Sequence, residues 1–230
     1  MASPSSSDGV PMGFIRPSSV YGDINKTRFI LQQVLAKMQT ATLVQVVSCT
    51  NSGGDSAVGF ADVLPLVNQI DGQGGSTPHS VVHNIPYFRV QGGANAIILD
   101  PAVGDIGICV FASRDISAVK TTKAQANPGS YRSFAFSDGL YLGGVLNGEP
   151  TQYIQFTNEG INIVSPTQIT LSAPLISFNG EIVQAAGTGN NATFNENITV
   201  IGDVTASGTS LHTHVHSGVE SGPNNTLGPV

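Results

Sequence analysis

The sequence predicts an all-β protein in two parts, with one short helix before them. Its 230 residues include 27 Gly and no Trp, and only 10% of them are charged. This composition is typical of a turn-rich β protein and unusual for a helical enzyme. Short apolar runs recur along most of the chain, separated by turn residues. No Lys or Arg occurs after residue 150, which marks a boundary between the two parts.

The distribution of charge limits the class of partner. The formal net charge is −6 and the isoelectric point is near 5.1, whereas a nucleic-acid-binding surface needs a basic stripe. We therefore expect no nucleic-acid partner. All nine basic residues and ten of the fifteen acids precede residue 151, so the second part carries five acids and no base.

Residues 1–39 are expected to form an arm followed by a helix. The arm is rich in Ser and Pro, and Asp23 or Asn25 can cap a helix that runs to about Met38. Four apolar residues at helical spacing make one face of this helix: Leu31, Val34, Leu35 and Met38. That face packs either on the chain's own domain or on a neighbouring subunit, and the sequence leaves both open.

The N-terminus has neither the basic nor the apolar segment of a secretory signal peptide. No apolar run reaches the length of about 18 residues that a membrane-spanning helix needs. We therefore expect the chain to be synthesised in the cytoplasm without a signal peptide.

The sequence of residues 40–117 predicts a small barrel. Strand-like runs cover Ala41–Cys49, 59–70, 81–90, 94–99 and Ile106–Phe111. Short strands with this turn spacing favour a Greek-key barrel such as an OB-fold. Residues 118–150 show little periodicity and are expected to be a partly ordered connector. Cys49 and Cys109 lie in separate apolar runs, which favours buried thiols over a disulfide.

Residues 151–209 show pairs of alternating apolar residues separated by turns. The pairs are Ile154 and Phe156, Ile161 and Ile163, Ile169 and Leu171, Ile176 and Phe178, Ile198 and Val200, and Val204 and Ala206. Strands this short bury little within one chain, but they become stable when identical copies wrap around a common axis. We predict such an intertwined shaft. An ordinary β-sandwich is the alternative, which the scarcity of large apolar residues disfavours.

No catalytic motif stands out, and we expect the protein not to be an enzyme. The chain contains no G-x-S-x-G, P-loop or H-E-x-x-H pattern. His79 and His83 would share one face of a strand, where such residues are more often inert than functional. Nothing in the sequence pairs the acids Asp55, Asp62 and Glu149.

Residues 210–230 carry the most specific pattern. Three of the five histidines, His212, His214 and His216, recur at spacing two, and a strand would direct all three to one face. Two imidazoles from each of three chains would supply six nitrogens, which suits an octahedral ion such as Fe²⁺ better than tetrahedral zinc. Such a closed site would be structural. A solvated histidine run without a metal is the alternative.

The same segment carries a resemblance to a known family. Residues Ser210-Leu211-His212-Thr213-His214-Val215-His216-Ser217-Gly218-Val219, followed by Gly222, Asn225-Thr226 and Gly228-Pro229, resemble the end of the membrane-piercing baseplate spikes of contractile-tailed, Mu-like bacteriophages. The resemblance extends to Val103-Gly104-Asp105-Ile106-Gly107, Arg114-Asp115-Ile116-Ser117 and Phe136-Ser137-Asp138-Gly139.

This resemblance implies an OB-fold at 40–117, a trimeric intertwined β-helix at 151–209 and an iron-binding apex at 210–230. It implies His214 and His216 of each chain as ligands of one Fe²⁺ per trimer. His212 stands where the family pattern is free, and it is kept as a further candidate.

The predicted function is that of a homotrimeric spike in the virion, at the tip of a phage tail baseplate. It would seat on a hub protein through its N-terminal region and pierce the host outer membrane when the tail contracts. A receptor-binding tail fibre or adhesin is one alternative, although no aromatic residue follows Phe194 to grip a sugar. A metalloenzyme that uses the histidines is the other.

Overall fold

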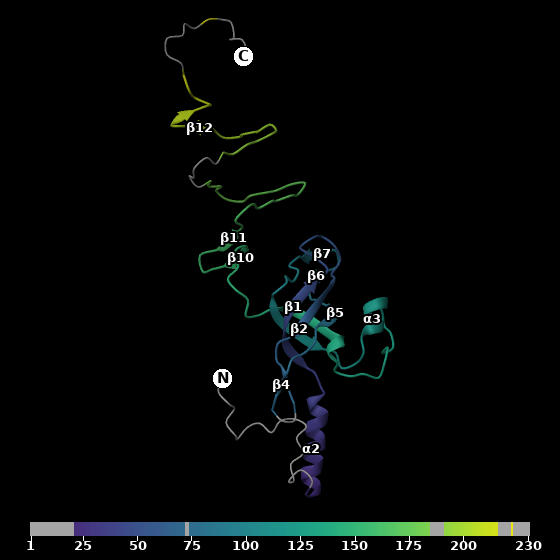
Figure 1. The fold of residues 1–230 in the computed structure, drawn as a ribbon. Coiled ribbons are helices and arrows are strands. Elements are labelled where there is room, and N and C mark those ends of the chain that lie inside the picture. Colours follow the sequence, from purple (N-terminus) through teal and green to yellow (C-terminus); the bar gives the residue numbers. More distant parts are fainter. Residues whose placement is uncertain (1–20, 72–73, 185–190, 216–221, 223–230) are drawn as a thin grey trace. The chain divides into compact units, whose positions relative to one another are not determined.

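A computed structural model describes residues 21–71, 74–184, 191–215 and 222 (Figure 1). The chain divides into two compact units, residues 1–167 and 168–230, and each is described by itself. The mostly extended backbone agrees with the all-β prediction. In the described part of the chain, no helix is long and apolar enough to cross a membrane.

The first unit is organised around a five-stranded antiparallel sheet. Its strands follow the order β5-β2-β1-β8-β9, and their bounds are β1 Ala41–Cys49, β2 Phe60–Pro65, β5 Val82–Pro86, β8 Ile106–Phe111 and β9 Gly139–Gly144. The two edges of this sheet meet, because Tyr87, just after β5, forms a parallel bridge with Tyr141 of β9. The Phe88 N–H also donates to the Tyr141 carbonyl at 2.7 Å. The sheet therefore curls back on itself.

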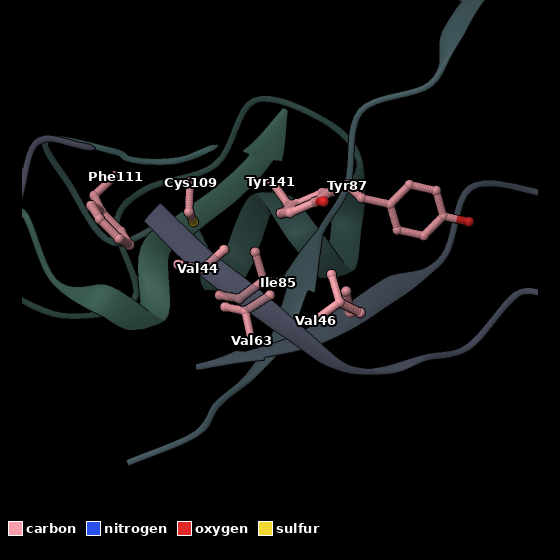
Figure 2. Packing of buried hydrophobic residues seen from close by; sticks show 9 residues of the cluster. Val44, Val46, Val63, Ile85, Tyr87, Cys109, Phe111 and Tyr141 are labelled. Atoms are coloured by element: carbon pink, nitrogen blue, oxygen red, sulfur yellow. The ribbon is translucent and has the colours of Figure 1, made fainter. Parts of the chain in front are cut away.

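The core of this unit lies inside the curled sheet (Figure 2). Alternate residues of β1, β2 and β8 point inward, as the two-residue period of a strand requires. The buried apolar residues are Val44, Val46, Ala61, Val63, Ile85, Tyr87, Cys109, Phe111 and Tyr141. Both cysteines are free, with Cys109 buried and Cys49 half-buried. The expectation of two thiols without a disulfide is confirmed.

The segment Val103–Gly107, part of the family resemblance, forms the turn into β8. Gly104 has a φ of +97°, a left-handed conformation that glycine adopts without strain. The Asp105 carboxylate accepts a hydrogen bond from the Ala102 N–H at 2.9 Å. A Cβ at Gly107 would run into the ring of Tyr141. The two glycines and the aspartate are thus explained by the turn and by the packing of β9.

The other two motifs of the resemblance meet at a buried ion network. The Arg132 guanidinium donates to Asp115 at 2.7 Å and to Asp138 at 2.7 and 2.9 Å. The Asp138 carboxylate also accepts from the Ile116 N–H, and Asp115 accepts from Ser130 and Ser117. Asp115 and Asp138 are almost fully buried. The network ties distant parts of the segment between β8 and β9 to one another.

The prediction for residues 118–150 was wrong in one respect. The segment includes β9, which completes the sheet, as well as most of the short helix α3 Ser117–Thr122 and the 3₁₀ turn η1 Phe136–Asp138. Strand β9 pairs with β8 and interrupts its ladder with a bulge. The predicted strands at 59–70, 81–90 and 94–99 are also shorter than expected. Besides β2 and β5, the region contains the hairpins β3 Gln69–Ile70 with β4 Ser76–Thr77, and β6 Val90–Gly92 with β7 Asn95–Ile97.

The predicted N-terminal helix is confirmed as α2 Asp23–Ala36. None of its residues is buried in the described part of the chain. Its end is tied to the sheet because the Gln39 N–H donates to the Phe134 carbonyl and the Phe111 N–H donates to the Thr40 carbonyl.

The segment after residue 150 has two short hairpins in its described residues. Strands β10 Tyr153–Phe156 and β11 Ile161–Val164 pair at the end of the first unit, and β12 Thr205–Ala206 and β13 Thr209–Ser210 pair in the second. No strand forms within residues 165–184 or 191–204 of the single chain. The apolar pairs stay exposed, with Phe156 at 76% and Phe178 at 60%.

Candidate metal-binding apex

The β12–β13 hairpin leads into the histidine segment. Ser207 and Gly208 both have positive φ values, of 50° and 86°, which is the backbone of the tight two-residue turns that join antiparallel strands. The hairpin thus fixes the direction in which the chain reaches Leu211. The Leu211 N–H donates to the Val204 carbonyl at 2.9 Å and extends the pairing by one residue.

Asp203 joins the start of this hairpin to its end. Its carboxylate accepts a hydrogen bond from the His212 N–H at 3.1 Å. The Ser210 hydroxyl, followed by the His212 and Val204 N–H groups, lowers the pKa of this carboxyl, because all three bonds favour its charged form. Asp203 therefore holds the histidine segment against the hairpin while it is ionised. The sequence analysis did not single out Asp203 for this role.

Ser210 begins a single helical turn. The Ser210 Oγ accepts a hydrogen bond from the Thr213 N–H at 2.9 Å, and the Ser210 carbonyl accepts from the His214 N–H at 3.1 Å. A serine that accepts from the third residue after it is the usual N-cap of a helix. In the Ser-Leu pair before the histidines, Ser210 is therefore the N-cap and Leu211 is the first residue of the turn.

This turn changes the expected placement of the histidines. Residues 211–213 form a turn and not a strand, so the expectation that His212 and His214 share a strand face was wrong. Successive residues of a helical turn are about 100° apart, which separates these two side chains by roughly 200°. His212 is thereby out of phase with His214 in the described backbone. The predicted ligand His216 lies outside the described residues.

The side chain of His214 has a defined orientation. Its Nδ1 lies 3.1 Å from the Leu211 carbonyl oxygen. A carbonyl can only accept, so Nδ1 carries the proton and the lone pair of the neutral ring is on Nε2. A backbone carbonyl on one ring nitrogen is the arrangement that commonly orients a metal-binding histidine through its other nitrogen. The chemistry of His214 therefore fits the predicted iron ligand.

A single chain is not expected to form this site alone. Among the described residues, no three His, Cys, Asp or Glu side chains come together in a way that could hold a metal. The sequence predicts two imidazoles from each chain, so the coordination sphere would be completed by two further copies. His214 is the described member of that set.

The other two histidines, His79 and His83, lie in the first unit, and each contacts a different residue. His79 packs edge-on against Phe136 with ring centroids 4.9 Å apart. His83 Nδ1 lies 2.9 Å from Asp62, and the Ser48 hydroxyl donates to the same Asp62 oxygen at 3.0 Å. The hydrogen bond from His83 and then those from Asn84 and Ser48 outweigh burial and lower the pKa of Asp62.

This Ser-Asp-His cluster differs from a hydrolase triad in the order of its bonds. A triad needs the imidazole between the serine and the carboxylate, so that the ring can take the hydroxyl proton. Here the carboxylate lies between the other two groups, and Ser48 donates to Asp62 and not to His83. The geometry supports a bridge between β1, β2 and β5.

Comparison with known proteins identifies the apex segment. A family model described as the GpV Apex motif matches residues 208–230. No curated protein matches the chain. The matched segment begins at Gly208 of the β12–β13 turn and includes all three clustered histidines. This motif is the apex of phage spike proteins of the T4 and Mu type, and it supports a phage tail component of the baseplate-spike kind.

Proposed function

We propose that this chain forms the homotrimeric central spike of a contractile phage tail or a related injection baseplate, and that it pierces the host outer membrane mechanically. The match of residues 208–230 to the GpV Apex motif carries the proposal. The alternation and exposure of the apolar residues that precede this motif support it independently.

Three intertwined copies account for the exposed segment after residue 150. Large apolar side chains alternate there but find no core in the single chain, as Ile163 at 56% and Ile169 at 52% exposure illustrate. A soluble protein rarely leaves so much contiguous apolar surface open. Extended backbone also needs hydrogen-bond partners when it is buried. Two further copies wound around one axis would supply both, and the strands missing from residues 165–184 and 191–204 would form between chains.

We assign the N-terminal barrel to the OB-fold. The strand order β5-β2-β1-β8-β9 with the parallel bridge from Tyr87 to Tyr141 supports this assignment, because an OB-fold is a five-stranded Greek-key barrel. In the proposed spike the barrel and the N-terminal region seat the trimer on the tail hub.

The proposed apex is a structural metal site without a catalytic role. Iron bound there would supply a cross-link between three chains at the point where they would otherwise fray. The residues that would hold it are His214 and His216 of each chain. Their six nitrogens would fill an octahedral ion and leave no open position for a substrate. The mechanical function then follows from topology, because intertwined chains resist force without unravelling one at a time.

The native mass and the metal content of the purified chain test this proposal together. A trimer that contains iron is expected. A tail fibre would also be trimeric. A trimer that lacks the metal and binds host glycans would therefore favour a tail fibre over the spike. A monomer would contradict the spike and the fibre alike.

A further inference from the structure

We infer that α2 of this chain packs against the α2 helices of two other copies in a short parallel three-helix bundle. The inference rests on the proposed trimer and goes beyond it, because the shaft and apex alone would not require the N-terminal helices to meet. It also names a partner for the apolar face of α2, which the sequence alone leaves without an assigned partner.

The helix lacks the support that would keep it folded by itself. A helix of 14 residues is marginal in water without tertiary packing, and no residue of α2 is buried in the described part of the chain. Its N-cap residue, Gly22, makes no side-chain capping bond. Ile24 is 84% exposed and Leu31 is 55% exposed. Another surface must therefore cover α2 if it is to persist.

The spacing of the exposed residues is that of a coiled-coil seam. Ile24, Leu31 and Met38 recur every seven residues, with Thr27 and Val34 between them. These are the a and d positions of a heptad. The polar residues Asn25, Lys26, Gln32 and Gln33 occupy the b and c positions, on the outer face. A shallow, mostly apolar hollow on this helix is lined by Ile24, Thr27, Leu31 and Leu35, and also by the polar residues Asp23, Arg28 and Gln32.

The flanking positions favour three parallel copies. Asp23 at g and Arg28 at e are placed so that the acid of one helix meets the base of its neighbour five residues further along, which is the usual ion pair of parallel coiled coils. The next such pair is Ile30 with Leu35, both apolar and more than half exposed. Apolar e and g residues widen the seam beyond the narrow stripe that a strict a and d pattern provides.

The rest of the chain supplies the proximity that so short a bundle needs. The end of α2 is fixed to the barrel by the bonds of Gln39 and Thr40, so three barrels held in one trimer would carry three helices in the same direction. Tethering raises the effective concentration of the helices and lets a weak contact form. The bundle would close the end of the spike that faces the hub, and a hub protein would then meet its outer polar face.

Cysteine cross-linking in the full-length chain tests the inference. Leu31→Cys places a thiol in the seam, and Gln32→Cys places one on the outer face one residue away. Treatment with a short bifunctional maleimide should give covalent dimers and trimers for Leu31→Cys on a denaturing gel. Gln32→Cys should remain at the level of the parent chain, which controls for Cys49 and Cys109.

The native mass of each variant separates the possible outcomes. A trimer in which Leu31→Cys fails to cross-link, or cross-links no better than Gln32→Cys, would overturn the bundle and leave the proposed spike intact. That result would indicate that a hub protein or residues 1–20 cover the apolar face of α2 in place of other α2 helices. A monomeric chain would instead contradict the proposed function on which the inference rests.

A second pair of variants tests whether the seam stabilises the helical conformation of α2. Leu31→Asn with Val34→Asn should remove the helical circular dichroism of α2 while the trimer persists through its shaft. Gln32→Asn with Gln33→Asn introduces the same residue type on the outer face and should leave most of that signal in place. Equal helical signals for the two double variants would show that the seam does not stabilise α2.

Discussion

One hydrogen bond determines which nitrogen of His214 can act as a ligand. The Leu211 carbonyl oxygen accepts a hydrogen bond from Nδ1 at 3.1 Å, so a metal would be bound through Nε2. The geometry depends on the Ser210 cap, which turns the chain and brings the Leu211 carbonyl back toward the ring. The Ser-Leu pair before the histidines therefore has a positioning role, although neither side chain would contact a metal.

The ligand assignment predicts distinct results for the three histidines. Replacing His214 and His216 together with Ala should abolish bound iron, because the double variant removes all six ligating nitrogens of the proposed site, two from each of three chains. His212→Ala should keep the iron, since its turn position separates it from His214. Elemental analysis of the purified trimers makes the comparison. Iron loss in His212→Ala would give that residue a place among the ligands.

Arg132 is predicted to make a large contribution to the stability of the barrel. Arg132→Ala leaves Asp115 and Asp138 buried without their guanidinium. We expect a loss of about 3 kcal/mol, at the low end for a broken buried ion pair because the Arg132 side chain is 39% exposed.

Chemical denaturation of the barrel measures this loss. The control is Arg114→Ala, which removes one long bond of 3.3 Å to Ser133 and should cost no more than about 0.5 kcal/mol. Similar losses in the two variants would contradict the role of the network.

Sequence reasoning at this scale found the charged motifs but not what connects them. Asp115 and Asp138 were noticed as parts of the family resemblance, whereas Arg132 lies in a segment with little periodicity and was not singled out. Its importance arises from the fold of the loop, which brings three residues of a 24-residue segment together. No local pattern in the sequence signals that closure.

At the scale of elements, the β8–β9 loop is predicted to weaken in acid. The Ser117 hydroxyl and N–H, with Ser130, lower the pKa of Asp115 to about 2. A carboxyl with a depressed pKa stabilises the fold fully above its unfolded value of 3.8, and this contribution is lost as the pH falls from there toward about 2.

Denaturant midpoints measured across that range test the prediction. Asp115→Asn removes the titrating group and should flatten the part of the pH dependence that arises from this site, while it lowers stability at neutral pH. An unchanged slope in Asp115→Asn would assign the acid sensitivity to other carboxyls.

The shaft strands are predicted to be buried in the assembly although they are exposed in one chain. Ile163→Asn in β11 should lower the temperature at which the trimer dissociates, since losing a buried aliphatic side chain costs at least about 2 kcal/mol per chain. Asn162→Ser changes the opposite face of the same strand and should have little effect. Heating in detergent followed by electrophoresis compares the two. Equal dissociation temperatures would contradict an interior position for Ile163.

The elements that the sequence predicted well are those with a strong local pattern. Strands β1 and β8 have long apolar or alternating runs, and α2 has a clear helical period. Strand β9 was missed because Leu140, Tyr141 and Leu142 form a short run flanked by glycines. It becomes a strand through pairing with β8 and through the fit of Tyr141 over Gly107. Both causes are tertiary, and neither is visible in a local window.

At the scale of the whole molecule, the chain combines a part with its own core and a part without one. In the described part of the barrel, nine apolar residues are buried in one core. The segment after residue 150 leaves its apolar side chains exposed and ends in the matched apex motif. The shift in charge predicted a boundary near residue 150, whereas the contacts within the single chain divide it after residue 167, because the β10–β11 hairpin belongs to the first unit. In the proposed spike, the barrels and the α2 bundle form the seat and the intertwined segment forms the piercing shaft.

The native mass of the full-length protein, measured together with its iron content, tests the central claim most directly. The proposed spike predicts a trimer with about one iron per three chains, as expected for six imidazoles around one octahedral ion. A monomer, or a trimer that contains no metal after purification without chelators, would contradict it.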